Sequence, residues 1–375
     1  MSGVVQATGA GRVRLAVAVA LLAAGLALPV SAAAAEPGKR PGDLALCGVG
    51  YQPVTPLTPA ALAASEPNIE GASPAPDAAA SALINPLLPP VVAAQALAAA
   101  WPRIQASLAA SPDVRQQAAA LRLAGIEALE TGSDAQAVRT RADTQRRLAA
   151  LALATSDATA MQWAVRSCDG ATAPGGCLGL SARHWVCVEP GNLAAWLYLL
   201  AQEPLARDEA LHGMALSRRA DFADRRLAAV VDAGLPADIP PYLRVVLAVL
   251  LIGIDAAQSM PSLQALQRAC DAPALKDSNR RQQCAALAGV MLGNGSSLTT
   301  LALGTRLGQH AGWPAERVQA LRAELAVLPA LHWQAMVTDQ PYGCSAVAGM
   351  RRWLAGTEQM GELGWLRQQR LATGR

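Results

Sequence analysis

From Val91 to its C-terminus, the chain alternates between helix-favouring stretches and short breaks that hold Gly, Pro, Asn or Asp. More than one residue in five is alanine, and only 3% are aromatic. Alanine, leucine, arginine and glutamine favour helices, whereas strands draw on β-branched and aromatic side chains. Helices joined by short loops pack as antiparallel neighbours. The sequence therefore predicts an all-α fold, in which antiparallel helical hairpins stack as an irregular repeat array or a bundle.

The breaks also predict where individual helices begin and end. Ser111-Pro112-Asp113 and Ser156-Asp157 are typical helix caps, because Ser and Asp oxygens accept hydrogen bonds from the first backbone amides of a helix. Counted from such signals, the expected helices span about 91–110, 111–129, 132–154, 156–166, 178–188, 192–202, 207–220, 224–232, 241–256, 261–271, 279–292, 297–309, 314–336, 345–356 and 358–371.

Residues 1–35 have the layout of a secretory signal peptide. Arg12 and Arg14 precede an apolar run over 15–30, and small residues follow it. This layout predicts export, with cleavage near Ala33 to Ala35 and a periplasmic or secreted mature protein. A membrane anchor is the alternative, but the run is shorter than the roughly 20 residues that span a bilayer. The next longest apolar run, 245–254, has the length of a buried helix, so we expect no transmembrane segment after cleavage.

Residues 36–90 are rich in Pro, Ala and Ser, and the helical domain is expected to occupy 91–375. Because proline removes a backbone donor and little apolar surface is available to offset ordering, the sequence predicts a flexible arm over 36–90. An arm lying on the body is the alternative, supported by the leucines and isoleucine of 83–88. Lipidation of Cys47 is disfavoured, because Leu46 stands where a lipobox has a small residue.

Seven cysteines in an exported chain predict disulfides, which persist in oxidising compartments. Cys168 and Cys177 flank one break between helices, and Cys270 and Cys284 flank another. Two cysteines at the same end of a helical hairpin approach the Cα separation that a disulfide requires, so we expect these two pairs to be bonded. Three cysteines are left without an assigned partner, and at least one of them is odd: Cys47, Cys187 and Cys344.

A metal site is the alternative use of the first cysteine pair. Cys168, Cys177, His184 and Cys187 place four potential metal ligands within 20 residues. Their spacing, C-x8-C-x6-H-x2-C, matches no common zinc pattern. We therefore expect disulfides, with no metal and no cofactor.

One segment of about 40 residues resembles the tetratricopeptide-repeat family. Pro190 lies six residues before Trp196, and Leu199 and Leu216 fall where that family places large apolar residues. The resemblance implies a helical hairpin array and a protein-binding surface, with Trp196, Leu199 and Leu216 in its core. In composition, the chain is also similar to alanine-rich exported proteins of high-GC Gram-negative bacteria.

No catalytic or phosphate-binding motif is present. The chain has no G-x-S-x-G, H-E-x-x-H, Walker or G-x-G-x-x-G sequence. A net charge of +3 gives no electrostatic footprint for nucleic acid. The histidines, His184, His212, His310 and His332, form no group with a nucleophile in the sequence.

Two functions therefore remain as hypotheses. The favoured one is an exported helical-repeat-like protein that binds or organises a protein partner without catalysis. The alternative is a periplasmic enzyme, whose cleft would gather His184, His212, His310 or His332 with carboxylates. A structural envelope factor tethered by the 36–90 arm is a weaker third hypothesis.

Overall fold

The computed structural model describes residues 43–53, 91–130, 135–168, 177, 179–222, 226–257, 263–293, 295–336 and 342–374. The expected signal peptide at 1–35 and most of the expected arm lie outside these residues, as does the loop 169–176. Within them, no helix is long and apolar enough to cross a membrane.

The described residues form an all-α body, as predicted, with one short hairpin of strands. The strands are β1 (Asp43–Leu46) and β2 (Gly50–Pro53). The helices are α3 (Val91–Ala109), α4 (Val114–Glu130), α5 (Ala135–Thr155), α6 (Ala158–Cys168), α7 (Ala182–Val188), α8 (Leu193–Gln202), α9 (Arg207–Leu216), α10 (Arg226–Ala233), α11 (Pro241–Ala257), α12 (Gln264–Ala269), α13 (Ser278–Val290), α14 (Leu298–His310), α15 (Ala315–Met336) and α16 (Cys344–Thr373), with short 3-10 turns at Pro204–Ala206 and Ala274–Lys276.

Side-chain caps explain why many of these helices begin where they do. Asp157 Oδ1 accepts hydrogen bonds from the backbone amides of Thr159 and Ala160, both at 2.9 Å, at the start of α6. At the start of α4, Asp113 Oδ1 rather than the Ser111 hydroxyl accepts from the amide of Arg115, at 2.8 Å. Each such bond satisfies a backbone amide that has no partner inside the helix.

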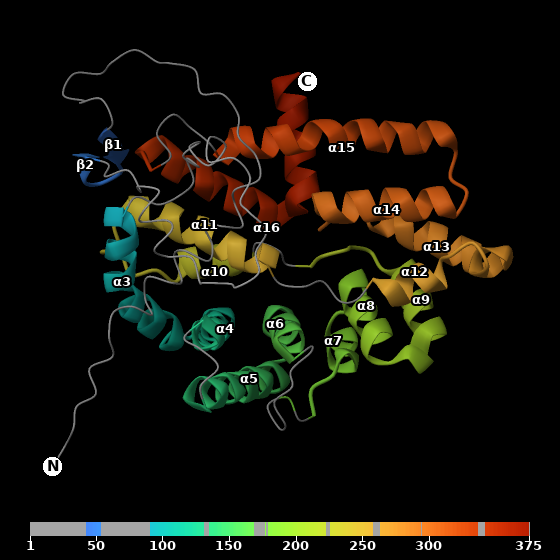
Figure 1. The fold of residues 1–375 in the computed structure, drawn as a ribbon, viewed down its shortest axis with the longest axis horizontal. Helices are drawn as coiled ribbons and strands as arrows, with labels where there is room; N and C mark the ends of the chain where they lie inside the picture. The colour runs from blue at the N-terminus through green and yellow to red at the C-terminus, as the bar shows by residue number, and fades with distance from the viewer. Residues whose placement is uncertain are drawn as a thin grey trace, which may run out of the picture.

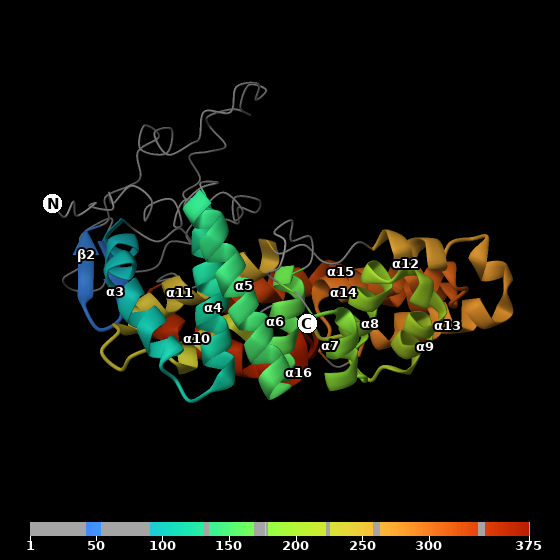
Figure 2. The same cartoon turned by 90° about the horizontal axis from the view of Figure 1, so that it is seen from below.

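Helices that follow each other in sequence pack against each other from α3 to α9 and again from α13 to α16 (Figure 1). The two series meet where α9 packs against α13, and where α10 and α11 lie between α16 and the helices α4 and α3. Figure 2 shows the resulting flattened body, in which α4, α5 and α6 lie side by side. Among the largest fully buried side chains are Trp163, Trp185 and Trp353.

Residues 43–53 form an antiparallel hairpin, where the sequence predicted a flexible arm. The prediction is wrong for this segment. Ala45 pairs with Tyr51, and the turn uses Gly48 and Gly50, whose φ angles are +87° and +95°. Glycine adopts such positive φ angles without the steric cost that a Cβ imposes. Leu46 is only 3% exposed, so burial of its side chain helps to offset the ordering of this segment.

A disulfide holds the hairpin to the helical body. Cys47 is bonded to Cys344 at the start of α16, 297 residues away in sequence, with their Cα atoms 4.7 Å apart. Beside it, the Cys47 amide donates to the carbonyl oxygen of Tyr342 at 2.9 Å. Burial raises the pKa of the Tyr342 hydroxyl. Two of the three cysteines that the sequence left unassigned therefore pair here, and the third, Cys187, is exposed and free.

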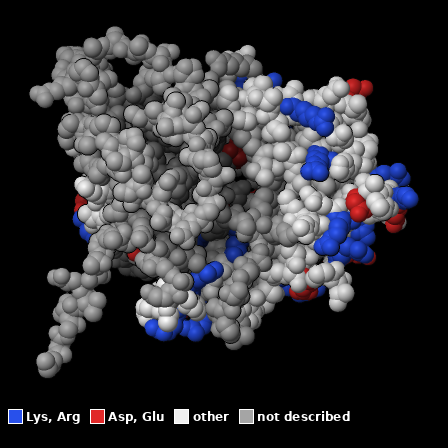
Figure 3. All heavy atoms as spheres, viewed as in Figure 1, with Lys and Arg blue, Asp and Glu red and all other residues white. Residues whose placement is uncertain are grey.

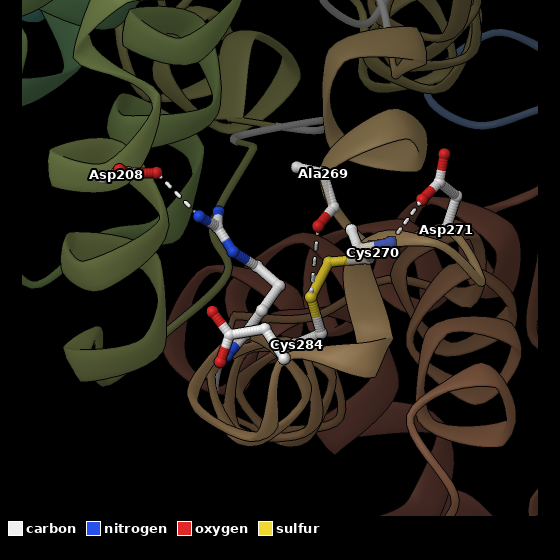
Figure 4. The surroundings of a disulfide bond; sticks show 8 residues. Asp208, Ala269, Cys270, Asp271 and Cys284 are labelled. Atoms are coloured by element: carbon white, nitrogen blue, oxygen red, sulfur yellow. Dashed lines mark hydrogen bonds and ion pairs between the residues drawn. A yellow bond between two sulfur atoms is a disulfide. The ribbon is translucent and has the colours of Figure 1, made fainter.

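The two pairs expected from the sequence also lie at disulfide distance. Cys168 and Cys177 have Cα atoms 5.8 Å apart, and those of Cys270 and Cys284 are 5.9 Å apart. Cys177 lies in a turn before α7, which begins at Ala182 and not near residue 178 as expected. Figure 4 shows the Cys270–Cys284 bond between the end of α12 and α13, close to the contact of α13 with α9.

Mass spectrometry of the non-reduced, alkylated protein should find three linked peptides, with Cys187 as the single alkylated thiol. Replacing Cys168 and Cys177 together by alanine should lower the free energy of unfolding by about 2–3 kcal/mol, mainly because the unfolded chain gains freedom. Free thiols at Cys168 and Cys177, or one zinc ion per chain, would contradict this assignment.

Candidate functional site

The segment that resembles a tetratricopeptide repeat forms a helical hairpin from α8 and α9. Asn192 caps α8, since its side-chain oxygen accepts from the Ala194 amide at 3.2 Å. Leu199 is fully buried. The next helices do not extend a regular array, because α9 packs against α13, whereas α10 packs with α11, α16 and α4. The tetratricopeptide assignment therefore stays a prediction.

The prediction that Leu216 lies in the core is wrong, because 67% of this residue is exposed. It is the last residue of α9, and the buried face of that helix is formed by Ala210, Leu211 and Met214 instead. The resemblance to the repeat family predicted a large apolar residue of the second helix at this position. Here α10 packs elsewhere, so nothing described covers Leu216.

Trp196 is partly buried and lies at the surface of the same hairpin. Its ring lies against Gly213 of α9, where a Cβ would come within 2.3 Å of Trp196 Cδ2. Its Nε1 donates to the carbonyl oxygen of Pro190 at 2.8 Å. Trp196 is therefore held in place, but it is not the fully buried residue that the sequence predicted.

Trp196 and Leu216 form one apolar edge of the hairpin, which we call the Trp196–Leu216 surface. Leu216 lies three residues after Gly213, and residues three apart are neighbours on a helix surface, so Leu216 lies on the side of α9 that the Trp196 ring contacts. At the other end of the hairpin, Leu205 is 104% exposed. Among the described residues, the large apolar side chains that are most exposed are Leu205, Leu371 and Leu216.

A buried polar network fixes the chain that follows Leu216. Glu189 is 6% exposed and accepts from Trp185 Nε1 at 2.7 Å, from Asn192 Nδ2 at 3.3 Å and from Arg219 Nη2. The Asn192 side chain also donates to the carbonyl oxygen of Asp221 at 3.0 Å and accepts from its amide at 3.1 Å. Charge-assisted bonds of this kind hold the segment after α9 against the start of α8.

Exposed ion pairs flank the hairpin. Arg183 contacts Glu203 at 2.8 Å and Glu209 at 3.2 Å, and these hydrogen bonds raise its pKa. Asp208 accepts from Arg280 of α13 at 2.7 Å, and this hydrogen bond lowers the pKa of Asp208 (Figure 4). On the face drawn in Figure 3, basic and acidic side chains are interspersed over the part that is not grey.

The histidines of the enzymatic alternative lie on four different helices, α7, α9, α14 and α15. His184 lies at the start of α7, where its Nδ1 is 3.2 Å from the Ser181 amide. His212 is exposed on α9, His310 is exposed at the end of α14, and the side chain of His332 lies outside the described part. Within the described residues, no group of three or more His, Cys, Asp or Glu side chains is arranged to hold a metal ion.

A buried ion pair between α4 and α11 was missed by sequence reasoning. Arg122 Nη2 donates to Asp255 Oδ1 at 2.5 Å, and their side chains are 1% and 0% exposed. The guanidinium also lies over the ring of Trp163, 5.3 Å from its centre. Several buried polar atoms on α4, α6 and α11 have no hydrogen-bond partner among the described residues: Arg122 Nε and Nη1, Asp255 Oδ2, Trp163 Nε1 and both amide atoms of Gln162.

A pocket of about 400 Å³ between α10 and α16 was also missed. We call it the α10–α16 pocket, and it is lined by Ala229, Asp232, Ala233, Leu235, Arg244, Arg351, Leu354, Ala355 and Glu358. No histidine and no cysteine is among these residues. The only sequence signal was the i, i+3, i+4, i+7 spacing of charged, leucine and alanine residues in α16, which is also typical of an ordinary packed helix.

Comparisons with known proteins assign no family to this chain. No family model, no curated protein and no solved structure matches the chain. Function is therefore inferred from the residues themselves.

Proposed function

We propose that this protein is an exported, non-catalytic interaction module that binds a protein partner through the Trp196–Leu216 surface. The observation that carries the proposal is the 67% exposure of Leu216 beside a tryptophan held over Gly213. Interface cores are enriched in tryptophan. An apolar edge surrounded by polar side chains suits a partner protein whose surface is also apolar at its centre and polar around it. Arg219, whose side chain is 46% exposed and paired with Glu189, supplies a charge at this end of the hairpin.

Export is the second part of the proposal. Three cysteine pairs at disulfide distance suit a periplasmic or extracellular protein, since disulfides persist outside the reducing cytosol. The basic, apolar and small-residue order of residues 1–35 supports cleavage of a signal peptide near Ala33 to Ala35. The tetratricopeptide-like hairpin supports protein binding by analogy with that family.

The test compares three tagged forms of the oxidised protein, mixed with a periplasmic extract of the organism that produces it. The unsubstituted protein should retain a defined partner, and Leu216→Glu should reduce its recovery at least tenfold, because a charge enters the apolar contact. Val138→Glu is the matched control, since Val138 is also exposed (51%) but lies on α5. It should retain the partner.

All three forms should unfold at the same temperature, because neither substituted side chain is buried. Equal recovery by Leu216→Glu and the unsubstituted protein would contradict the proposed surface. Failure of every form to retain a partner would contradict the interaction function.

A further inference from the structure

The α10–α16 pocket exists because small side chains face each other across two helices. Ala229 and Ala233 of α10 and Ala355 of α16 line it with no atoms beyond Cβ. Leu235 and Leu354, which are 9% and 4% exposed, supply an apolar floor. A volume of about 400 Å³ lies in the range of small-ligand sites.

Two of the four charged residues in the pocket neutralise each other. Arg244 Nη1 contacts Asp232 Oδ1 at 2.9 Å, and their side chains are 14% and 20% exposed. Arg244 also donates to the backbone carbonyl oxygen of Asp232 at 3.0 Å, which fixes it in the wall. This pair is structural, and it leaves little charge for a ligand.

The other two charges are available to a ligand. Arg351 is 56% exposed in its side chain, and its contact with Asp232 is a long one of 3.7 Å. Glu358 is exposed and forms no ion pair with another described residue. The pocket therefore presents one cation and one anion above an apolar floor.

The spacing of these two charges selects the length of the ligand. Arg351 and Glu358 lie seven residues apart on α16, which is about 10.5 Å along the helix axis. Three extended residues span about 10–11 Å. A ligand of this length with opposite charges at its two ends can reach both side chains, whereas a ligand with two charges of the same sign satisfies only one of them.

We propose that the α10–α16 pocket binds a short apolar peptide of about three residues with free ends, its carboxylate on Arg351 and its ammonium on Glu358. The guanidinium suits a carboxylate because its donors match two oxygens at once. Small apolar side chains of the peptide lie on Leu235 and Leu354. This site is separate from the Trp196–Leu216 surface and does not depend on it.

Calorimetric titration of the oxidised full chain with tri-alanine at low salt tests the proposal. Tri-alanine should bind, whereas its N-acetylated and C-amidated forms and free alanine should each bind about two- to fivefold more weakly. Arg351 and Glu358 are exposed, an exposed ion pair contributes at most about 1 kcal/mol, and 1.4 kcal/mol corresponds to a tenfold change in affinity.

Matched variants assign each end of the peptide. Arg351→Gln should weaken the binding of tri-alanine about two- to fivefold. It should also remove the difference in affinity between the peptide with a free carboxyl end and the amidated peptide. Glu358→Gln should do the same for the ammonium end, and Arg352→Gln, an exposed neighbour outside the pocket, should change neither. Absence of tri-alanine binding, or equal binding of the free and blocked peptides, would overturn the proposal.

Discussion

Replacing Arg122 by methionine should lower the free energy of unfolding by about 3–5 kcal/mol, because it leaves a buried carboxylate without its partner. The Asp255 side chain is 0% exposed and bonded to Arg122 at 2.5 Å. Burial raises the pKa of Asp255 and lowers that of Arg122, so desolvation outweighs the mutual attraction of this pair. Urea unfolding followed by far-UV circular dichroism measures the effect.

Two controls separate burial from charge. Arg103 and Asp238 form an ion pair of 2.8 Å with side chains 56% and 63% exposed, so Arg103→Met should cost at most about 1 kcal/mol. Arg122→Met combined with Asp255→Leu should regain most of the lost stability, because no uncompensated charge remains. An unfolding midpoint of Arg122→Met equal to that of the unsubstituted protein would contradict a buried, uncompensated Asp255.

Local signals were sufficient to predict most of the helices. Asp157, Asn192 and Ser297 accept backbone amide bonds at the starts of α6, α8 and α14, close to the breaks read from the sequence. The hairpin over 43–53 was missed because its stability comes from the distant Cys344 and from the burial of Leu46. No local pattern shows either of them.

The candidate sites were harder to predict, because they depend on which helices meet. Asp255 was visible as an acid that ends an apolar run, but its partner Arg122 lies on a helix 133 residues earlier. Leu216 was placed in the core by its position in a family pattern, but α10 packs against α4, α11 and α16, and Leu216 is 67% exposed. The α10–α16 pocket follows from the alanines of two helices, and sequence patterning does not show which alanines face each other.

The break expected near residue 357 lies instead at Gly361, inside α16. Gly361 has φ +73°, and a Cβ there would lie 2.7 Å from the Cα of Gly295. The kink docks α16 on the start of α14. There the Leu298 amide donates to Glu362 Oε2 at 3.0 Å, and the Leu363 amide donates to the carbonyl oxygen of Ser296 at 2.9 Å.

Gly361→Ala should therefore lower the free energy of unfolding by about 2–6 kcal/mol. The backbone of Gly361, with φ +73° and ψ +167°, lies in a region that is essentially restricted to glycine and costs a residue with a Cβ about 1–3 kcal/mol. Forcing an atom into a packed backbone costs about 1–3 kcal/mol more. Gly289→Ala is the matched control, because Gly289 lies inside α13 with nothing within 4 Å of an added Cβ. That substitution should stabilise the protein by about 0.5–1 kcal/mol. Urea unfolding should therefore give changes of opposite sign in the free energy of unfolding for the two Gly→Ala substitutions. A loss of stability at both glycines, or at neither, would contradict the kink as the cause.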